Sequence, residues 1–392
     1  MEKKRRKMEK KQEMESSNKN WEIPPDHILH QLIFSKLSIV DLQACRQVCK
    51  SWNNIVVQFD SNLFFAQTSP DSRNIHCMDF DPKHMGAMNS LASFTFHPKY
   101  SSASSKILCC CHGLLLCSFR FFKFYDLIEY SRTKICILNP FTNEYLVVSS
   151  DTGNRHDNYS YAFGFSLNTK QFKIVRFTYK HSSFQPSSTS IEIYAFETLC
   201  PRLRPLGFLP TSIQTDGAYY FNGALYWVGT DQQLLLKAHK DVIYCLDLED
   251  YKLNQCSLPQ HNQFRLAYFF GALNGALYLT TLENEDQYQM WKMEQDVFSC
   301  IILFVLPKLN LRFSKHLPQH SRSLINLQPI KICEDGKFLC LLGGLVFLLC
   351  DPNTGTTQVL TDQDVEIEKH FKVFPIETFN FNSLHNILLG CA

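Results

Sequence analysis

The densest group of residues that could do chemistry is a stretch rich in cysteine and histidine in the first third of the chain. Thiolates and imidazoles are the usual ligands of zinc, and this stretch contains Cys109, Cys110, Cys111, His112 and Cys117. Adjacent residues of a strand point to opposite faces of a sheet, so these side chains cannot converge on one tetrahedral ion. No C-x-x-C pair occurs among the 16 cysteines. We therefore expect no metal site, and we interpret the cysteines as small buried apolar residues in a reducing compartment.

Motifs of catalytic chemistry are absent from the sequence. It contains no G-x-S-x-G nucleophile turn, no G-x-x-x-x-G-K phosphate loop, no H-E-x-x-H zinc pair and no G-x-G-x-x-G dinucleotide fingerprint. The sequence therefore predicts a non-catalytic protein with no catalytic residues and no cofactor.

The segment from Ile23 to Ile55 has the spacing of two amphipathic helices. Ser38 and Asp41, three residues apart, resemble a capping box that opens the second helix. The apolar positions are Ile28, Leu29, Leu32, Ile33 and Leu37 in the first helix, and Leu42, Cys45, Val48, Cys49, Trp52, Ile55 and Val56 in the second. Two helices this short cannot bury both stripes in a core of their own. Either a partner covers the remainder, or the pair packs on its own domain.

The order of these residues resembles the F-box, the helical motif that attaches a substrate receptor to the Skp adaptor of a Skp-cullin-F-box ubiquitin ligase. Ile23-Pro24 stands where that family usually has Leu-Pro, and the run from Val48 to Trp52 matches its V-C-K-x-W signature. The adaptor-binding residues implied by this resemblance are Ile23, Pro24, Ile28, Leu29, Ile33, Leu37, Leu42, Cys45, Val48, Cys49 and Trp52.

The sequence departs from that family at the turn between the helices and near the start. Leu37 is followed by Ser38 where the family often has proline, and Pro25 and His27 replace common acidic residues. These changes remove no apolar anchor, although the first could alter the turn. We expect Leu42, Val48 and Trp52 to be buried across the adaptor interface, so that alanine there weakens adaptor binding without unfolding the rest.

Charge is concentrated in a tail formed by residues 1–20. Residues 1–11 contain seven Lys or Arg against two Glu, which leaves 32 basic and 35 acidic residues in the remaining chain. We expect this tail to be disordered, since it has few apolar residues. Its K-K-R-R-K run fits either a nuclear import signal or a charged leader exposed to solvent. Because the chain after residue 11 has no excess of basic residues to neutralise phosphates, no nucleic-acid partner is expected. Neither a secretory signal nor a membrane span is found, which predicts a cytoplasmic or nuclear protein with no membrane contact.

Internal repeats follow the helical segment. The five residues Asn-Gly-Ala-Leu-Tyr occur at 222–226 and again at 274–278, and looser copies lie at 111–117 and 334–340. Each is a glycine-containing turn that leads into an apolar strand, as at the start of a tight hairpin. Repeats of about 50 residues with three or four strands fit the blades of a kelch-like β-propeller. Near the C-terminus, strands between Phe374 and Leu389 are expected to close the ring against an early strand.

The repeats also resemble the plant F-box-associated domain, whose short motifs occur in the same order. They match Gly113–Cys117, Asn139–Thr142, Gly164-Phe165, Asn222–Trp227 and Asp351–Thr354. The resemblance implies a propeller-like β-domain that presents a substrate. At about 50 residues per repeat, residues 105–392 hold about six blades, in a range of five to seven. The expected fold is therefore an α+β multidomain protein, with a small N-terminal helical F-box and then an all-β propeller. Its expected domains are a basic tail (1–20), an F-box module (21–60), a connecting segment (61–104, with one strand near 92–96) and the β-propeller (105–392).

The function that this resemblance implies is substrate recognition within a ubiquitin ligase. The partners would be a Skp-family adaptor, a cullin bound through that adaptor, and a protein substrate. Loops between strands would bind the substrate, and the candidates are 151–159, 181–190, 230–240 and 308–323, the last of which has a local basic run. The substrate-binding residues are unknown. An adaptor-binding scaffold that acts outside a ligase and a propeller enzyme are the alternatives.

Overall fold

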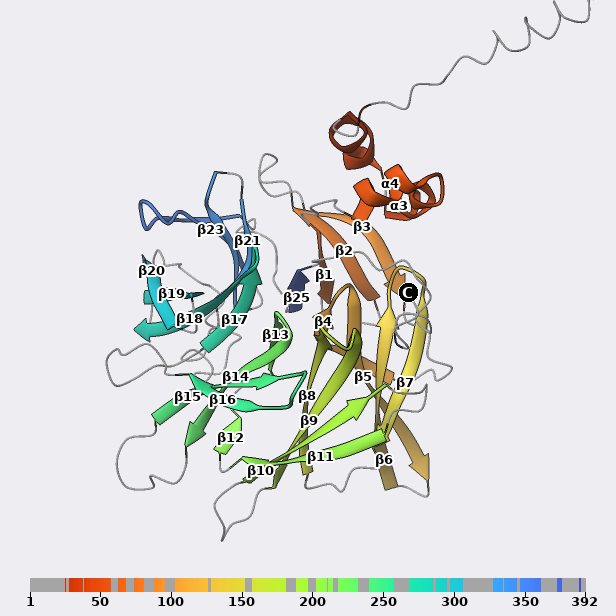
Figure 1. Cartoon of the computed structure of the whole chain (residues 1–392), viewed down its shortest axis with the longest axis vertical. Helices are drawn as coiled ribbons and strands as arrows, with labels where there is room; N and C mark the ends of the chain where they lie inside the picture. Colours follow the sequence, from red (N-terminus) through yellow and green to blue (C-terminus); the bar gives the residue numbers. More distant parts are fainter. Residues whose placement is uncertain are drawn as a thin grey trace, which may run out of the picture. The chain divides into compact units, whose positions relative to one another are not determined.

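The structure is a computed structural model of the 392-residue chain (Figure 1). It describes residues 25, 28–37, 39–57, 63–67, 74–80, 88–95, 103–125, 128–151, 157–180, 188–196, 202–209, 211–213, 218–231, 240–256, 268–284, 287–294, 297–305, 327–333, 335–343, 346–360, 372–375 and 388. The chain divides into two compact units, Met1–Phe59 and Asp60–Ala392. The expected disorder of residues 1–20 lies outside the described residues.

Short helices make up the described part of the first unit. They are η1 (Leu29–Ile33), a π-helical turn, η2 (Phe34–Lys36), a 3-10 turn, and the α-helices α3 (Ile39–Arg46) and α4 (Lys50–Val57). None of the helices in the described ranges is long and apolar enough to cross a membrane.

The described residues of the second unit form six antiparallel sheets, which we number as blades 1 to 6. Blade 1 has the strand order β25 (Lys372–Pro375), β1 (Leu63–Gln67), β2 (Asn74–Phe80), β3 (Met88–Thr95). Blade 2 contains β4 (Ala103–Cys111), β5 (Leu114–Tyr125), β6 (Ile128–Asn139) and β7 (Glu144–Asp151), and blade 3 contains β8 (Asp157–Ser166), β9 (Gln171–Lys180), β10 (Ser188–Ala195) and β11 (Arg202–Leu209).

The remaining three blades complete the all-β unit. Blade 4 contains β12 (Thr211–Ile213), β13 (Tyr219–Phe221), β14 (Ala224–Asp231), β15 (Lys240–Asp247) and β16 (Leu253–Cys256). Blade 5 contains β17 (Tyr268–Leu273), β18 (Ala276–Asn284), β19 (Gln287–Glu294) and β20 (Val297–Val305), and blade 6 contains β21 (Leu327–Ile332), β22 (Phe338–Leu342), β23 (Val346–Cys350) and β24 (Thr357–Val359). The number of sheets lies within the predicted range of five to seven blades.

The innermost strands of neighbouring blades contact one another around a closed ring. Strand β4 contacts β8, β8 contacts β13, β13 contacts β17, β17 contacts β21, β21 contacts β25, and β25 returns to β4. Apolar clusters fill the spaces between blades: one joins blades 2 and 3, another joins blades 3 and 4, and further clusters join blades 4 and 5 and blades 5 and 6. This radial packing of sheets is the β-propeller architecture.

Blade 1 corrects the expected connecting segment at 61–104. Three of its strands come from that range, where the sequence indicated one strand near 92–96. The fourth is β25, whose Phe374 is paired with Phe65 of β1. This pairing agrees with the expected closure of the ring by C-terminal residues. Local sequence does not indicate this sheet, because a strand from the far end of the chain completes it.

Two-residue turns join the first two strands of several blades. His112 and Gly113, Asn222 and Gly223, and Asn274 and Gly275 all have positive φ, which is the conformation of a type I′ hairpin turn. Glycine and asparagine tolerate this conformation better than other residues. The predicted hairpin entrances at these three repeats are therefore confirmed.

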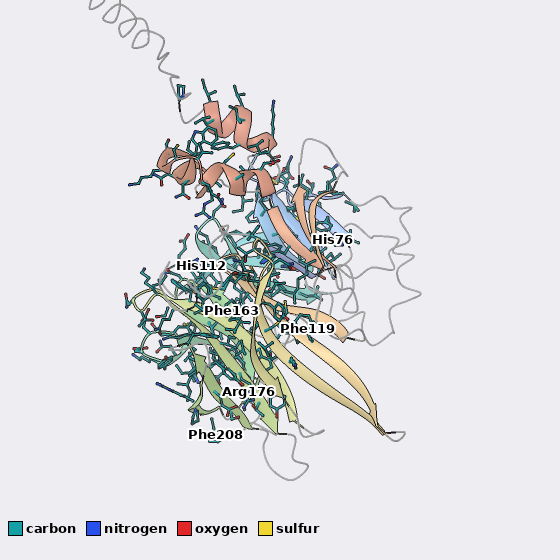
Figure 2. All side chains as sticks on the ribbon, turned by 90° about the vertical axis from the view of Figure 1, so that its right-hand side faces the viewer. His76, His112, Phe119, Phe163, Arg176 and Phe208 are labelled. Carbon is teal, nitrogen blue, oxygen red and sulfur yellow. The ribbon has the colours of Figure 1, made fainter. Side chains whose placement is uncertain are left out.

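The antiparallel order places the turns between first and second strands at one end of the propeller and the connections between second and third strands at the other end. Figure 2 shows His112, in the turn from β4 to β5, at one end, and Phe208, near the last residue of β11, toward the other. The four candidate loops join a second strand to a third, or a fourth strand to the next blade, so the strands that they connect all meet the Phe208 end. Residues 152–156, 181–187, 232–239 and 308–323 within them lie outside the described residues.

Candidate functional site

The N-terminal module has a small core of its own. Leu29, Phe34, Leu42, Ile55 and Val56 are all buried. The ring of Phe34 meets Trp52 edge-on, with ring centroids 5.2 Å apart. Phe34 was absent from the sequence-based set of site residues, and its helical spacing to Leu37 is the signal that could have included it.

The second predicted helix is interrupted, which corrects the expectation of one continuous helix over this run. Helix α3 ends with tight turns in which the N–H groups of Gln47 and Val48 donate to carbonyls three residues earlier. Cys49 then starts α4, because its Sγ accepts a hydrogen bond from the N–H of Trp52 at 3.5 Å. A further hydrogen bond ties the two helices together, from Arg46 Nε to Asn53 Oδ1 at 2.8 Å.

Three large apolar side chains are exposed on the described part of the module. Val48 is 62% exposed in the turn between α3 and α4, and Leu32 and Ile33 of η1 are 59% and 40% exposed. These three are the large apolar side chains at exposed positions of the described module, and a partner that covers them would remove them from water. We call Leu32, Ile33 and Val48 the exposed apolar set.

The other sequence-predicted residues divide by burial. Ile28, Leu37, Cys45, Cys49 and Trp52 are half-buried, so each is partly available to a partner. Leu29 and Leu42 are buried within the module, at 1% and 2% exposure. The expectation that Leu42 is buried across the adaptor interface stays a prediction, and its side chain is already buried in the chain without a partner. Ile23 and Pro24 lie outside the described residues.

The turn without the family's proline has a backbone that would suit one. Leu37 has φ −84° and ψ 149°, and its N–H donates to the carbonyl of Phe34 at 3.1 Å. This extended conformation is the one that a residue adopts before proline. The substitution at Ser38 therefore leaves Leu37 in the conformation that a Leu-Pro pair would impose. Ser38, and with it the predicted capping box, lies outside the described residues.

The cysteine and histidine stretch of the sequence lies on β4, on β5 and in the turn between these two strands of blade 2. Cys109 and Cys110 are half-buried, whereas Cys111 and Cys117 are buried, and burial raises the pKa of the Cys117 thiol above its ordinary value. His112 packs against the rings of Phe165 and Tyr220. Within the described ranges, no three His, Cys, Asp or Glu side chains gather as metal ligands would.

His112 gives a pH-dependent prediction. Burial, and to a smaller extent the charge of Lys170, lowers the pKa of His112. Below a pH of about 6.5 the imidazole of the unfolded chain binds a proton, whereas that of the folded chain does so only at lower pH. The free energy of unfolding therefore decreases as the pH is lowered below about 6.5. His112→Asn, which suits the turn as Asn222 and Asn274 do, should lose less stability between pH 7 and pH 5. Thermal denaturation at both pH values measures this difference, and an unchanged drop in melting temperature would contradict it.

Comparison with known protein families gives one match for the N-terminal helical module and another for the β-propeller. A model of the F-box domain matches residues 22–64, and a model described as the F-box associated beta propeller domain matches residues 67–294. The chain belongs to the F-box-associated β-propeller family. The propeller match of this family begins at residue 67, inside β1, in agreement with the reassignment of the segment at 61–104 to blade 1.

Relatives of this F-box-associated protein include two Arabidopsis thaliana proteins named as F-box proteins. One is 25% identical over 296 residues, which cover 69% of this chain and 67% of the relative. The other is 24% identical over 294 residues, which cover 69% and 68%. Among solved structures, a lectin of Aleuria aurantia covers 78% of this chain and 90% of its own, with 9% identity and a TM-score of 0.36. That TM-score supports no statement about what this chain binds.

Proposed function

We propose that this chain is the substrate-recognition subunit of a Skp-cullin-F-box ubiquitin ligase. The observation that carries the proposal is the exposed apolar set on a module that matches the F-box domain. Leu32, Ile33 and Val48 would lie against the Skp-family adaptor, and the half-buried Trp52 and Cys49 would border that contact. Removing these side chains from water stabilises such a complex by about 25 cal/mol per Å² of apolar surface.

In this proposal the β-propeller contributes recognition and no bond-making chemistry. A cullin bound through the adaptor would bring the conjugating enzyme, and the propeller would hold a protein substrate whose lysines then lie within reach. This role is supported by the position of the four candidate loops, because the strands that they connect all terminate on the side of the propeller where Phe208 lies. Action in the cytosol or nucleus belongs to the same proposal, because the adaptor and cullin must be present.

Co-purification tests the proposal directly. The full chain should bring down a purified Skp-family adaptor and, with it, the cullin, and the reconstituted complex should support transfer of ubiquitin. Adaptor binding without assembly of cullin or transfer would favour the scaffold alternative. Failure to bind any Skp-family adaptor would refute the receptor function, and turnover of a small molecule by the full chain would favour the enzyme alternative.

A further inference from the structure

The repeated sequence Asn-Gly-Ala-Leu-Tyr forms corresponding turns in blades 4 and 5. Asn222 and Gly223 join β13 to β14, and Asn274 and Gly275 join β17 to β18. Both residues of each turn have positive φ. Because the two turns share their sequence and their backbone conformation, a difference in their chemistry has to come from the residues around them.

An asparagine that precedes a glycine can lose its side-chain amide without an enzyme. The backbone nitrogen of the glycine attacks the asparagine Cγ, the bond from Cγ to the amide nitrogen breaks, and ammonia leaves with the proton of the glycine N–H. The resulting five-membered succinimide takes up water, and its opening at either carbonyl gives aspartate or isoaspartate. Glycine permits the attack because it has no Cβ to hinder approach to its nitrogen. The reaction therefore depends on whether the glycine nitrogen is accessible.

The glycine nitrogen of the blade 4 turn is hydrogen-bonded and covered. In a two-residue hairpin the turn's own hydrogen bond joins the residues on either side, so the glycine N–H is left for another acceptor. The N–H of Gly223 donates to the hydroxyl of Tyr220 at 3.3 Å, and that hydroxyl donates to the carbonyl of Phe165 in blade 3 at 3.0 Å. Gly223 is buried, and the side chain of Leu167 lies 3.3 Å from the place that a Cβ of this glycine would take.

The glycine of the blade 5 turn is not covered in this way. Asn274 and Gly275 are both exposed, and beyond the chain neighbours of Gly275 no atom lies within 4 Å of the place that its Cβ would take. The residue that corresponds to Tyr220 in this repeat is Ala272, which has no hydroxyl to accept the glycine N–H. Since Asn222 is exposed as well, the surroundings of the glycine, and not those of the amide, distinguish the two turns.

We propose that Asn274 is a site of spontaneous deamidation in the folded protein, and that the hydrogen bond from Gly223 to Tyr220 protects Asn222 from the same reaction. The proposal goes beyond the proposed function and does not depend on it.

The two products would affect blade 5 differently. Aspartate at position 274 would keep the turn, because Asp tolerates positive φ. Isoaspartate would route the main chain through its side-chain carbon and add one backbone atom between Leu273 and Ala276, whose pairing closes the hairpin. The modified turn would loosen β17, which contacts the innermost strands of both neighbouring blades.

Ageing of the purified full chain tests the assignment. The folded protein is incubated at mildly alkaline pH and digested with trypsin, and liquid chromatography with mass spectrometry separates the Asn, Asp and isoaspartate forms of each peptide. Asn274 should lose its amide at least about fivefold faster than Asn222, which is the factor that one net hydrogen bond supplies. In chain denatured with urea the two amides should react at equal rates, because the five residues from Asn to Tyr are the same.

Two variants separate the local cause from a general loosening of the propeller. Asn274→His should abolish both products at this position and keep the fold, because His112 occupies the corresponding position of the blade 2 turn with positive φ. Tyr220→Phe removes the acceptor of the Gly223 N–H, so it should speed the loss at Asn222 by at least about fivefold and leave the rate at Asn274 unchanged. A general loosening would raise both rates.

Several results would overturn the proposal. Equal rates at the two positions of the folded chain, faster loss at Asn222, or two intact amides in folded chain that both react in urea would each do so. An unchanged rate at Asn222 in the Tyr220→Phe chain would remove the protective role of the hydroxyl.

Melting temperature tests the effect of the product on blade 5. The fraction that contains isoaspartate should melt about 2 °C or more below the fresh protein, whereas the Asn274→Asp variant should melt with the fresh protein. Equal melting of all three would show that isoaspartate does not loosen β17. None of these measurements involves the adaptor, so they stand or fall separately from the receptor function.

Discussion

Replacing Val48 by Glu is expected to weaken adaptor binding by about 100-fold or more. Val48 is 62% exposed in the turn between α3 and α4, so the free module tolerates the change. In the proposed complex the valine is removed from water, and a carboxylate at that place would be buried without a partner, which costs several kcal/mol. Calorimetric titration of the purified adaptor into wild-type and variant chains measures the difference.

Controls for this variant come from the propeller and from the core of the module. Val147 on β7 is 42% exposed, so Val147→Glu makes the same chemical change outside the F-box and should leave adaptor affinity within about twofold of wild type. Leu42→Ala should also weaken binding, but by loosening the module's core, which costs about 2–5 kcal/mol. Equal affinity of the Val48→Glu variant and the wild type would contradict the placement of the adaptor on the exposed apolar set.

Helical spacing identified the apolar positions of the F-box module but not their roles. The predicted apolar stripe of the second helix contained both Leu42 and Val48 and assigned both to the adaptor interface. In the structure, Leu42 is buried and Val48 is exposed. The difference arises at Cys49, where α3 and α4 separate and the chain changes direction. A periodic pattern assumes one straight helix, so it cannot show which side of a break faces the core.

The propeller could be predicted where its signals are local. Asn-Gly turns followed by apolar runs marked hairpins in blades 4 and 5, because positive φ at both turn residues demands those residue types. Blade 1 could not be assembled in this way. Its pairing of Phe65 with Phe374 joins distant parts of the chain, and no pattern in either strand specifies the other.

Buried polar residues were also beyond prediction from the sequence. Lys173 on β9 is 3% exposed, although lysine almost always reaches solvent. Its Nζ donates to the carbonyl of Leu248 in blade 4 at 2.5 Å and lies 4.5 Å from the centre of the Tyr251 ring. These partners are contributed by a neighbouring blade, so the burial of Lys173 depends on ring packing that local sequence does not encode.

Replacing Trp227 by Ala is expected to lower the free energy of unfolding of the propeller by about 3–5 kcal/mol. Trp227 on β14 is fully buried between blades 3 and 4, with its ring 5.2 Å from Phe177 and stacked at 5.7 Å on Tyr244. Alanine would leave a cavity between the two sheets and remove both ring contacts. Chemical denaturation followed by tyrosine and tryptophan fluorescence measures the change.

Two further variants show whether packing is the cause. The Nε1 of Trp227 is buried without a hydrogen-bond partner, so Trp227→Phe removes volume but no hydrogen bond and should cost less than Trp227→Ala. Phe208, at 75% exposure, is a matched aromatic control, and Phe208→Ala should change stability by less than about 0.5 kcal/mol. Because the F-box module has its own core, the folded Trp227→Ala variant should bind the adaptor with wild-type affinity. A Trp227→Phe variant as unstable as Trp227→Ala would show that the cavity is not the source of the loss.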